Sequence, residues 1–325
     1  MILCIFQLKM SFPQDLQRLA FSHQQMGTTF RIILYTEDTL AAKKVIDSVF
    51  SRIDALNAVL SDYDSKSELS RFSQTAGSQQ KVPLSADLMY VLKQSRQFSR
   101  DSKGAFDLTI GPLTKLWRRA FRQGKPPRKE AIEAATKLVS YKKLKLYAKR
   151  RKGKLAVSGS RLDAGGIAKG FTVDQAYRIL RDAGLPIALV DGGGDIYAGE
   201  APPGKPGWKI STKTMASNGV MTDSTLFIAN RAIATSGDTY RFLEWQGKRY
   251  SHIIDPRTGM GISDQRRVSV MANNCLTADA LASVYSILNP KEGKKLARKY
   301  QKATITIIFP QIKKQLIWGA KPSSK

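Results

Sequence analysis

The apolar positions along the chain predict strands interspersed with helices. Residues 28–36 are typical of a strand, whereas residues 40–60 place apolar side chains three and four residues apart, the period of an amphipathic helix. Further helices are predicted over 86–101, 129–139, 173–183, 277–288 and 291–301. Further strands are predicted over 187–190, 208–212, 225–235, 248–254 and 266–272, with a closing pair near 303–317.

This order of elements lacks the strict βαβ alternation of a parallel sheet. It predicts an α+β fold, a single intertwined globule in which a mostly antiparallel or mixed sheet is flanked by helices. No polar linker divides the chain into separable parts. We therefore expect one domain over residues 26–310, preceded by an N-terminal extension, 1–25, and followed by a basic C-terminal tail, 311–325.

The first residues bear on the location of the protein. Their apolar run is too short to span a bilayer, and it has neither a basic leader nor a small-residue cleavage site. The chain as encoded is therefore expected to be soluble and cytoplasmic. A true start at Met10 or a longer N-terminus leaves open that the extension is a mis-started or vestigial leader, and that the protein is periplasmic or membrane-associated.

Basic residues greatly outnumber acidic ones, since 53 Lys and Arg against 26 Asp and Glu leave a net charge of +27. The electrostatic field of so positive a protein attracts phosphate-bearing ligands and anionic surfaces, so a nucleic-acid-binding protein is one function class to consider. The charge is spread along the chain, however, and no zinc-finger, RNP1 or KH signature accompanies it. Its densest run, 142–154, alternates leucine with lysine and predicts a β-hairpin that turns at Lys152-Gly153. We expect a basic solvated surface and no specific nucleic-acid partner.

Cysteine and histidine are scarce. Two cysteines, Cys4 and Cys275, exclude a disulfide framework, and two histidines without a CxxC pair exclude the usual zinc sites. Any metal is therefore expected to take oxygen ligands, as Mg²⁺ does. Asp279 and Ser283 are four residues apart in a predicted helix, so a carboxylate and a hydroxyl share one face and suit a hard cation. The alternative is that Asp279 only complements the helix dipole.

Two glycine-rich segments each follow a predicted strand. Residues 163–170 carry Lys169 before the last glycine, and residues 191–195 place three glycines between two aspartates. Neither fits a Walker A loop or a dinucleotide-binding fingerprint. A glycine-rich turn that leads into a helix still brings backbone N–H groups up to an anion, and Lys169 adds a charge suited to phosphate. His252, at the end of an apolar strand, suits a general base. A solvent-exposed lysine and a structural histidine are the alternatives.

Six motifs follow one another along the chain. They are Met26-Gly-Thr; Ser61-Asp-Tyr63-Asp with Ser67-Glu-Leu-Ser-Arg-Phe72; Gly104-Ala-Phe-Asp107 with Ile110-Gly-Pro-Leu; Asp163-Ala-Gly-Gly-Ile-Ala-Lys-Gly170; Gly193-Gly-Asp195-Ile with Thr235-Ser-Gly237; and Ser251-His-Ile-Ile-Asp-Pro-Arg-Thr-Gly259 ahead of Ala278-Asp-Ala-Leu-Ala-Ser283. In this order they resemble the ApbE-like family of FAD:protein FMN transferases. The resemblance covers nearly the whole chain and implies an ApbE-like, T-fold-like α+β domain.

The resemblance also implies roles for single residues. Those expected to contact FAD are Met26, Tyr63, Ala105, Phe106, Asp107, Asp163, Lys169 and Ile254. Among them, Tyr63 is expected to cover a flavin face and Lys169 to hold phosphate. The backbone carbonyl of Gly166, the carboxylate of Asp279 and the hydroxyl of Ser283 are expected to bind Mg²⁺, with Mn²⁺ as the alternative. His252 is expected to activate the acceptor hydroxyl.

The implied reaction is Mg²⁺-dependent transfer of FMN from FAD to a Ser or Thr hydroxyl of a target flavoprotein, through a phosphoester bond and with release of AMP. The expected partners are FAD and an acceptor flavoprotein, a redox or electron-transfer protein that carries the Ser/Thr flavinylation site. Membrane contact is expected only through an acceptor complex or a missing N-terminal signal. An FAD pyrophosphatase, in which water replaces the acceptor, and a non-catalytic flavin-binding carrier are the alternatives.

Overall fold

The computed structural model describes residues 16–237 and 242–319; residues 1–15, 238–241 and 320–325 lie outside the described part of the chain. The predicted leader with Met10, and the end of the predicted basic tail, therefore fall outside it. Within the described ranges, no helix combines the length and the hydropathy that crossing a membrane requires.

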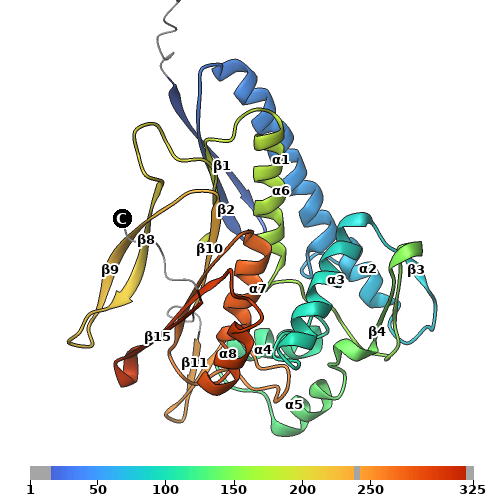
Figure 1. Ribbon diagram of the computed structural model, residues 1–325. Coiled ribbons are helices and arrows are strands. Elements are labelled where there is room, and N and C mark those ends of the chain that lie inside the picture. Colours follow the sequence, from blue (N-terminus) through green and yellow to red (C-terminus); the bar gives the residue numbers. More distant parts are fainter. Residues whose placement is uncertain (1–15, 238–241, 320–325) are drawn as a thin grey trace, which may run out of the picture.

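A sheet of eight strands forms the centre of the structure (Figure 1). In spatial order its strands are β1 (Gln17–Gln25), β2 (Thr28–Thr36), β6 (Ala188–Gly192), β7 (Asp195–Ala198), β10 (Arg231–Gly237), β13 (Arg267–Ala272), β14 (Thr304–Phe309) and β15 (Lys314–Gly319). Every neighbouring pair is antiparallel. The predicted α+β class with a mostly antiparallel sheet flanked by helices is confirmed.

Alternate residues of β2 face two different cores, as the period of a strand requires. Phe30, Ile32 and Leu34 are fully buried against helices, whereas Ile33 and Tyr35 pack against the opposite core. The first face of the sheet is covered by α1 (Thr39–Leu60), α6 (Ala168–Asp182) and α7 (Cys275–Tyr285). The second is covered by a ribbon of β8 (Trp208–Met215) and β9 (Met221–Ile228).

Most of the remaining helices and small strands lie below α6 in the view of Figure 1. The helices are α2 (Glu68–Gln74), α3 (Ala86–Asp101), α4 (Gly111–Gln123), α5 (Lys129–Thr136) and α8 (Pro290–Ala297), with short 3₁₀ turns η1 (Tyr141–Lys143), η2 (Ala148–Arg150) and η3 (Pro310–Ile312). The small sheets are β3 (Val82–Pro83), β5 (Lys152–Leu155) and β4 (Leu144–Tyr147), and the pair β11 (Phe242–Trp245) with β12 (Lys248–Ser251). A third apolar cluster joins α4 and α5 to Ile254.

The large sheet extends past both boundaries that the sequence predicted for the domain. Strand β1 pairs with β2 along its whole length although it precedes Met26, and β15 pairs with β14 although it follows residue 310. Met26 and Gly27 have φ values of 52° and 72°, the left-handed turn that joins two antiparallel strands. The described residues of the predicted extension and tail therefore include sheet strands.

Three sequence predictions need correction. The strand predicted over 225–235 is two strands, β9 and β10, because Asn230 adopts a left-handed turn with φ 52° between them. The predicted hairpin forms, but it turns at η2 and not at Lys152-Gly153. Gly153 lies inside β5, where a Cβ atom would stand 2.7 Å from atoms of Leu84 and Phe72. Helix α4 was not predicted, although its start at Gly111-Pro112 is favourable because proline suits a first helical turn.

Candidate functional site

Helices α6 and α7 lie against each other where the predicted metal and phosphate residues meet. The backbone N–H of Gly170 donates to the Asp279 carboxylate at 3.0 Å. A Cβ atom at Gly170 would stand 2.4 Å from the carbonyl oxygen of Cys275, so only glycine permits this approach of the two helices. The sequence predicted a loop over 163–170 and a helix that begins at 173. In the structure α6 begins at Ala168 and therefore carries Lys169 in its first turn.

The three predicted metal ligands lie together at this contact. A Cβ atom placed on Gly166 would stand 2.9 Å from the hydroxyl of Ser283 and 3.3 Å from the ring of Phe106. Asp279 lies one turn before Ser283 on α7. In the described part of the chain, no group of three or more His, Cys, Asp or Glu side chains could hold a metal. One carboxylate, one hydroxyl and one carbonyl are nevertheless all oxygen donors, which fits Mg²⁺ better than a softer ion.

Charged groups are concentrated at the start of α6. Lys169 forms an ion pair with Asp195 of β7, and its side chain keeps 30 % exposure whereas that of Asp195 keeps 5 %. Burial, and then the charge of Asp195, raise the pKa of Asp279 to about 7, although Lys169 opposes the rise. Burial would lower the pKa of Lys169, but the carboxylates of Asp279 and Asp195 hold it above its ordinary value. A permanent, partly accessible cation therefore lies beside the predicted metal ligands.

The segment Ala105–Asp107 is rigidly held. Ala105 and Phe106 are buried, and the Asp107 carboxylate accepts hydrogen bonds from the backbone and hydroxyl of Thr109 and from the backbone of Tyr141, at 2.6–2.8 Å. Burial raises the pKa of Asp107, although these three bonds oppose the rise. The carboxylate is thus committed to the protein itself and shapes the loop beside Gly166.

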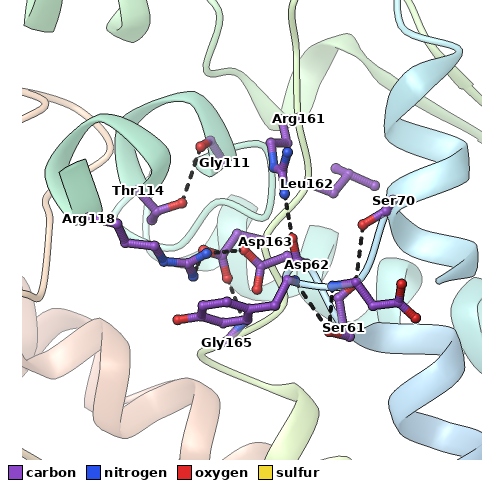
Figure 2. Close-up of polar contacts among 12 residues, drawn as sticks. Ser61, Asp62, Ser70, Gly111, Thr114, Arg118, Arg161, Leu162, Asp163 and Gly165 are labelled. Atoms are coloured by element: carbon purple, nitrogen blue, oxygen red, sulfur yellow. Dashed lines mark hydrogen bonds and ion pairs between the residues drawn. The ribbon is translucent and has the colours of Figure 1, made fainter. Parts of the chain in front are cut away.

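Tyr63 and Asp163 belong to a second group of polar residues, in which Figure 2 shows Arg118 between Asp62 and Asp163. Arg118 of α4 bonds the carboxylates of Asp62 and Asp163, and its guanidinium lies 4.0 Å from the centre of the Tyr63 ring. Asp163 in turn accepts a 2.8 Å hydrogen bond from the backbone of Gly165, next to the predicted metal ligand Gly166. Asp163 therefore connects this group to the α6–α7 contact.

Tyr63 also borders a cavity of about 310 Å³. Its other lining residues are Ser65, Ser70, Ser73, Gln74, Ser160 and Arg161. This volume is near the lower end of the range for ligand pockets, about 300–1,000 Å³. The cavity is rich in hydroxyl groups and holds one guanidinium, so it suits a polar ligand portion.

His252 and Ile254 lie in the segment that follows β12. His252 is exposed, whereas Ile254 is buried in the cluster with Leu113 and Trp117 of α4. The indole N–H of Trp117 donates to the carbonyl oxygen of Gly259 at 2.8 Å, which ties this segment to α4. Helix α4 thus holds both the His252 segment and, through Arg118, the Tyr63 group.

Met26 reaches the same region from the turn between β1 and β2. Its sulfur lies 3.6 Å from the hydroxyl of Thr172, one turn after Lys169 on α6. The structure therefore gathers Met26, Phe106, Gly166, Lys169, Asp279 and Ser283 around the start of α6, with Tyr63 and Asp163 linked to them. The sequence interpretation quoted Asp62 and Asp195 within motifs but assigned no role to them or to Arg118. Apolar spacing at Leu113, Leu116, Trp117 and Ala120 was the signal that could have revealed the helix that carries Arg118.

The ApbE family profile matches residues 26–309. This chain belongs to the ApbE family. It is 31 % identical over 302 residues to the FAD:protein FMN transferase of Haemophilus influenzae, covering 89 % of this chain and 86 % of that protein. It is 30 % identical over 300 residues to that of Treponema pallidum, covering 88 % and 83 %.

Solved structures of the family share the fold. The flavin transferase ApbE from Vibrio cholerae superimposes with a TM-score of 0.82 at 26 % identity, covering 94 % of this chain and 98 % of that one. The apo form of the flavinyl transferase ApbE from Pseudomonas stutzeri gives 0.79 at 29 % identity, covering 90 % and 92 %. In both comparisons the similarity extends over nine tenths or more of each chain.

Proposed function

We infer that this chain is an FAD:protein FMN transferase. It transfers FMN from FAD to a hydroxyl group of a target flavoprotein and releases AMP. The observation that carries this conclusion is the agreement between full-length similarity to FAD:protein FMN transferases and the geometry at the start of α6. There a lysine, a carboxylate, a hydroxyl and a glycine-rich turn converge, which suits a pyrophosphate.

Within this function we propose that Asp279, Ser283 and the carbonyl of Gly166 hold Mg²⁺, with Mn²⁺ as the alternative. Support comes from the closeness of the three residues and from the all-oxygen donor set. A bound cation would neutralise charge on the FAD pyrophosphate. Lys169 binds phosphate from the same side, because its ammonium is partly accessible and keeps its proton over the whole physiological range.

The transfer step moves one proton and exchanges one bond at phosphorus. The acceptor oxygen, from a Ser or Thr side chain, bonds to the phosphorus of the FMN half of FAD. The bond from that phosphorus to the bridging oxygen breaks, and AMP leaves with the bridging oxygen. His252 takes the hydroxyl proton of the acceptor, for which its exposure is suitable, since the acceptor belongs to another protein.

We assign the remaining predicted FAD contacts to side chains or to backbone according to how exposed each residue is. Tyr63 offers an exposed ring to the flavin, and Met26 and Asp163 flank the start of α6. Because the Asp107 carboxylate is fully engaged, we propose that Ala105–Asp107 contacts FAD through its backbone. Ile254 supports the His252 segment from the core, so we propose that its backbone, more than its side chain, faces FAD.

The site assignment is tested with variants of the purified full-length chain, incubated with FAD, Mg²⁺ and a flavoprotein acceptor. Asp279→Ala should abolish both AMP release and FMN attachment, and His252→Ala should lose attachment while FAD still binds. The matched controls are Asp182→Ala, an exposed carboxylate at the far end of α6, and His23→Ala, the other histidine, which stacks on Phe50. Full activity of Asp279→Ala would refute the metal site, and full attachment by His252→Ala would refute the base.

A further inference from the structure

Arg118 makes three contacts that no other side chain around Tyr63 duplicates. One guanidinium nitrogen bonds the Asp62 carboxylate, another bonds that of Asp163 at 2.9 Å, and the planar group lies 4.0 Å from the centre of the Tyr63 ring (Figure 2). A planar fork with several N–H groups and a flat face is what such a triple contact needs. Lysine, a point charge, could make the ion pairs but not the stacking.

The three contacts of Arg118 are not needed to hold α4 in place. The helix is anchored by the buried side chains of Leu113 and Trp117, by the Trp117 bond to Gly259, and by the bond from Gly111 to the carbonyl of Arg161. Arg118 lies about 100° around the helix from Trp117, beside that buried face, and its side chain is 31 % exposed. Its contacts therefore serve the loop that carries Tyr63 more than the helix.

Tyr63 has few other restraints. Its ring is 78 % exposed, and the nearby hydrogen bond, from its backbone N–H to the hydroxyl of Ser61, fixes the main chain only. A tyrosine with so little packing is expected to change rotamer freely. The stacked guanidinium is thus the contact that holds the ring in one orientation, and Asp62 and Asp163 hold the guanidinium in turn.

We propose that Arg118 is a positioning residue for FAD: it fixes the Tyr63 ring and, by covering one of its faces, leaves only the opposite face for the isoalloxazine. The proposal rests on the proposed function and deepens it, because it names how this chain prepares its flavin platform. Asp62 and Asp163 act through Arg118 and do not need to touch the flavin. The loss of a cation stacked on an aromatic ring should therefore be measurable as weaker FAD binding.

The test is a double-mutant cycle on FAD binding, without divalent cation and acceptor so that no turnover occurs. Calorimetry gives the affinity, and the visible absorption band of the flavin reports stacking. Arg118→Lys keeps the charge that the two aspartates require but removes the flat face, and it should weaken FAD binding about three- to tenfold with loss of the stacking signature. In a Tyr63→Ala background, Arg118→Lys should have no further effect.

The control is Arg122→Lys, one turn further along α4; among the described residues it is Arg118, and not Arg122, that stacks on Tyr63, so affinity should stay unchanged. Equal losses from Arg118→Lys with and without Tyr63, or wild-type affinity in Arg118→Lys, would overturn the proposal. If Arg118→Lys does not fold, Arg118→Gln combined with Asp62→Asn removes one buried charge with its partner and enters the same cycle. Absence of FAD binding by the wild-type protein, with Mg²⁺ as well as without it, would refute the proposed function instead.

Discussion

The carboxylate of Asp174 on α6 binds the first residues of α7. Replacing it tests how the contact between these two helices is stabilised. It accepts hydrogen bonds from the backbone N–H groups of Cys275 and Leu276 at 2.7 and 2.9 Å. These N–H groups belong to the first two residues of α7, and such groups have no hydrogen-bond partner within the helix. The same pair of helices carries Gly166 and Ser283 at its other end, so Asp174 helps to set the geometry of the site.

The structure gives the size and the sign of the pH-dependent stability change expected for Asp174→Asn. Burial raises the pKa of Asp174 to about 6, against the ordinary 3.8, although its two hydrogen bonds oppose the rise. Such a difference corresponds to about 3 kcal/mol, and the partial exposure of the side chain reduces it to about 2 kcal/mol. The folded chain binds this proton more tightly than the unfolded chain does. The contribution of Asp174 to the free energy of unfolding is therefore greatest below pH 4 and falls as the pH rises through about 6.

The assay is urea unfolding of the wild-type protein and of Asp174→Asn at several pH values from 4 to 7. Titrations elsewhere in the protein cancel in the difference between the two free energies of unfolding. That difference should shift by about 2 kcal/mol in favour of the variant over this range. Asp182→Asn, whose side chain is 57 % exposed at the far end of the same helix, is the matched control for replacing a helical aspartate. A constant difference for Asp174→Asn, or one that shifts towards the wild type with rising pH, would refute the reasoning.

Three further predictions concern the site. Lys169→Met leaves Asp195 buried without its cation and should lower the free energy of unfolding by about 3 kcal/mol, recovered in part by Asp195→Asn; unchanged urea stability of Lys169→Met would contradict this. Gly170→Ala forces α6 away from α7 and should cost about 1–3 kcal/mol and most AMP release, so a fully active variant would exclude the tight contact. Asp107→Asn turns an amide N–H₂ towards a backbone N–H group of Thr109 or Tyr141, and it should lower the free energy of unfolding by about 1–3 kcal/mol in calorimetry. An unaltered melting temperature would contradict this.

Elements with a long, regular apolar period were predictable from the sequence. The helix predicted over 86–101 has the same bounds as α3, and that predicted over 40–60 differs from α1 by one residue at its start. Helix α4 was missed because proline and five Lys, Arg and Gln side chains obscure its apolar face, and because a glycine-proline pair suggests a turn. Strand β1 was missed because its exposed edge position needs little apolar surface.

The site was predictable only where its residues are neighbours along the chain. The spacing of Asp279 and Ser283 on one helix face is visible in the sequence, and α7 carries both. No local pattern pairs Arg118 with Asp62, 56 residues away, or Lys169 with Asp195, 26 residues away. Such pairs depend on how the helices pack, because burial of a charge requires a partner that only the tertiary structure supplies.

The central claim is that FMN becomes bonded to a protein hydroxyl, and the mass of the acceptor tests it most directly. The wild-type protein is incubated with FAD, Mg²⁺ and a flavoprotein acceptor that contains a Ser/Thr flavinylation site, and the intact acceptor is weighed while AMP is measured. The account predicts an acceptor heavier by one FMN, with one AMP released for each FMN attached and the added group on a Ser or Thr. AMP release without a gain in mass, or FAD that stays intact, would contradict it.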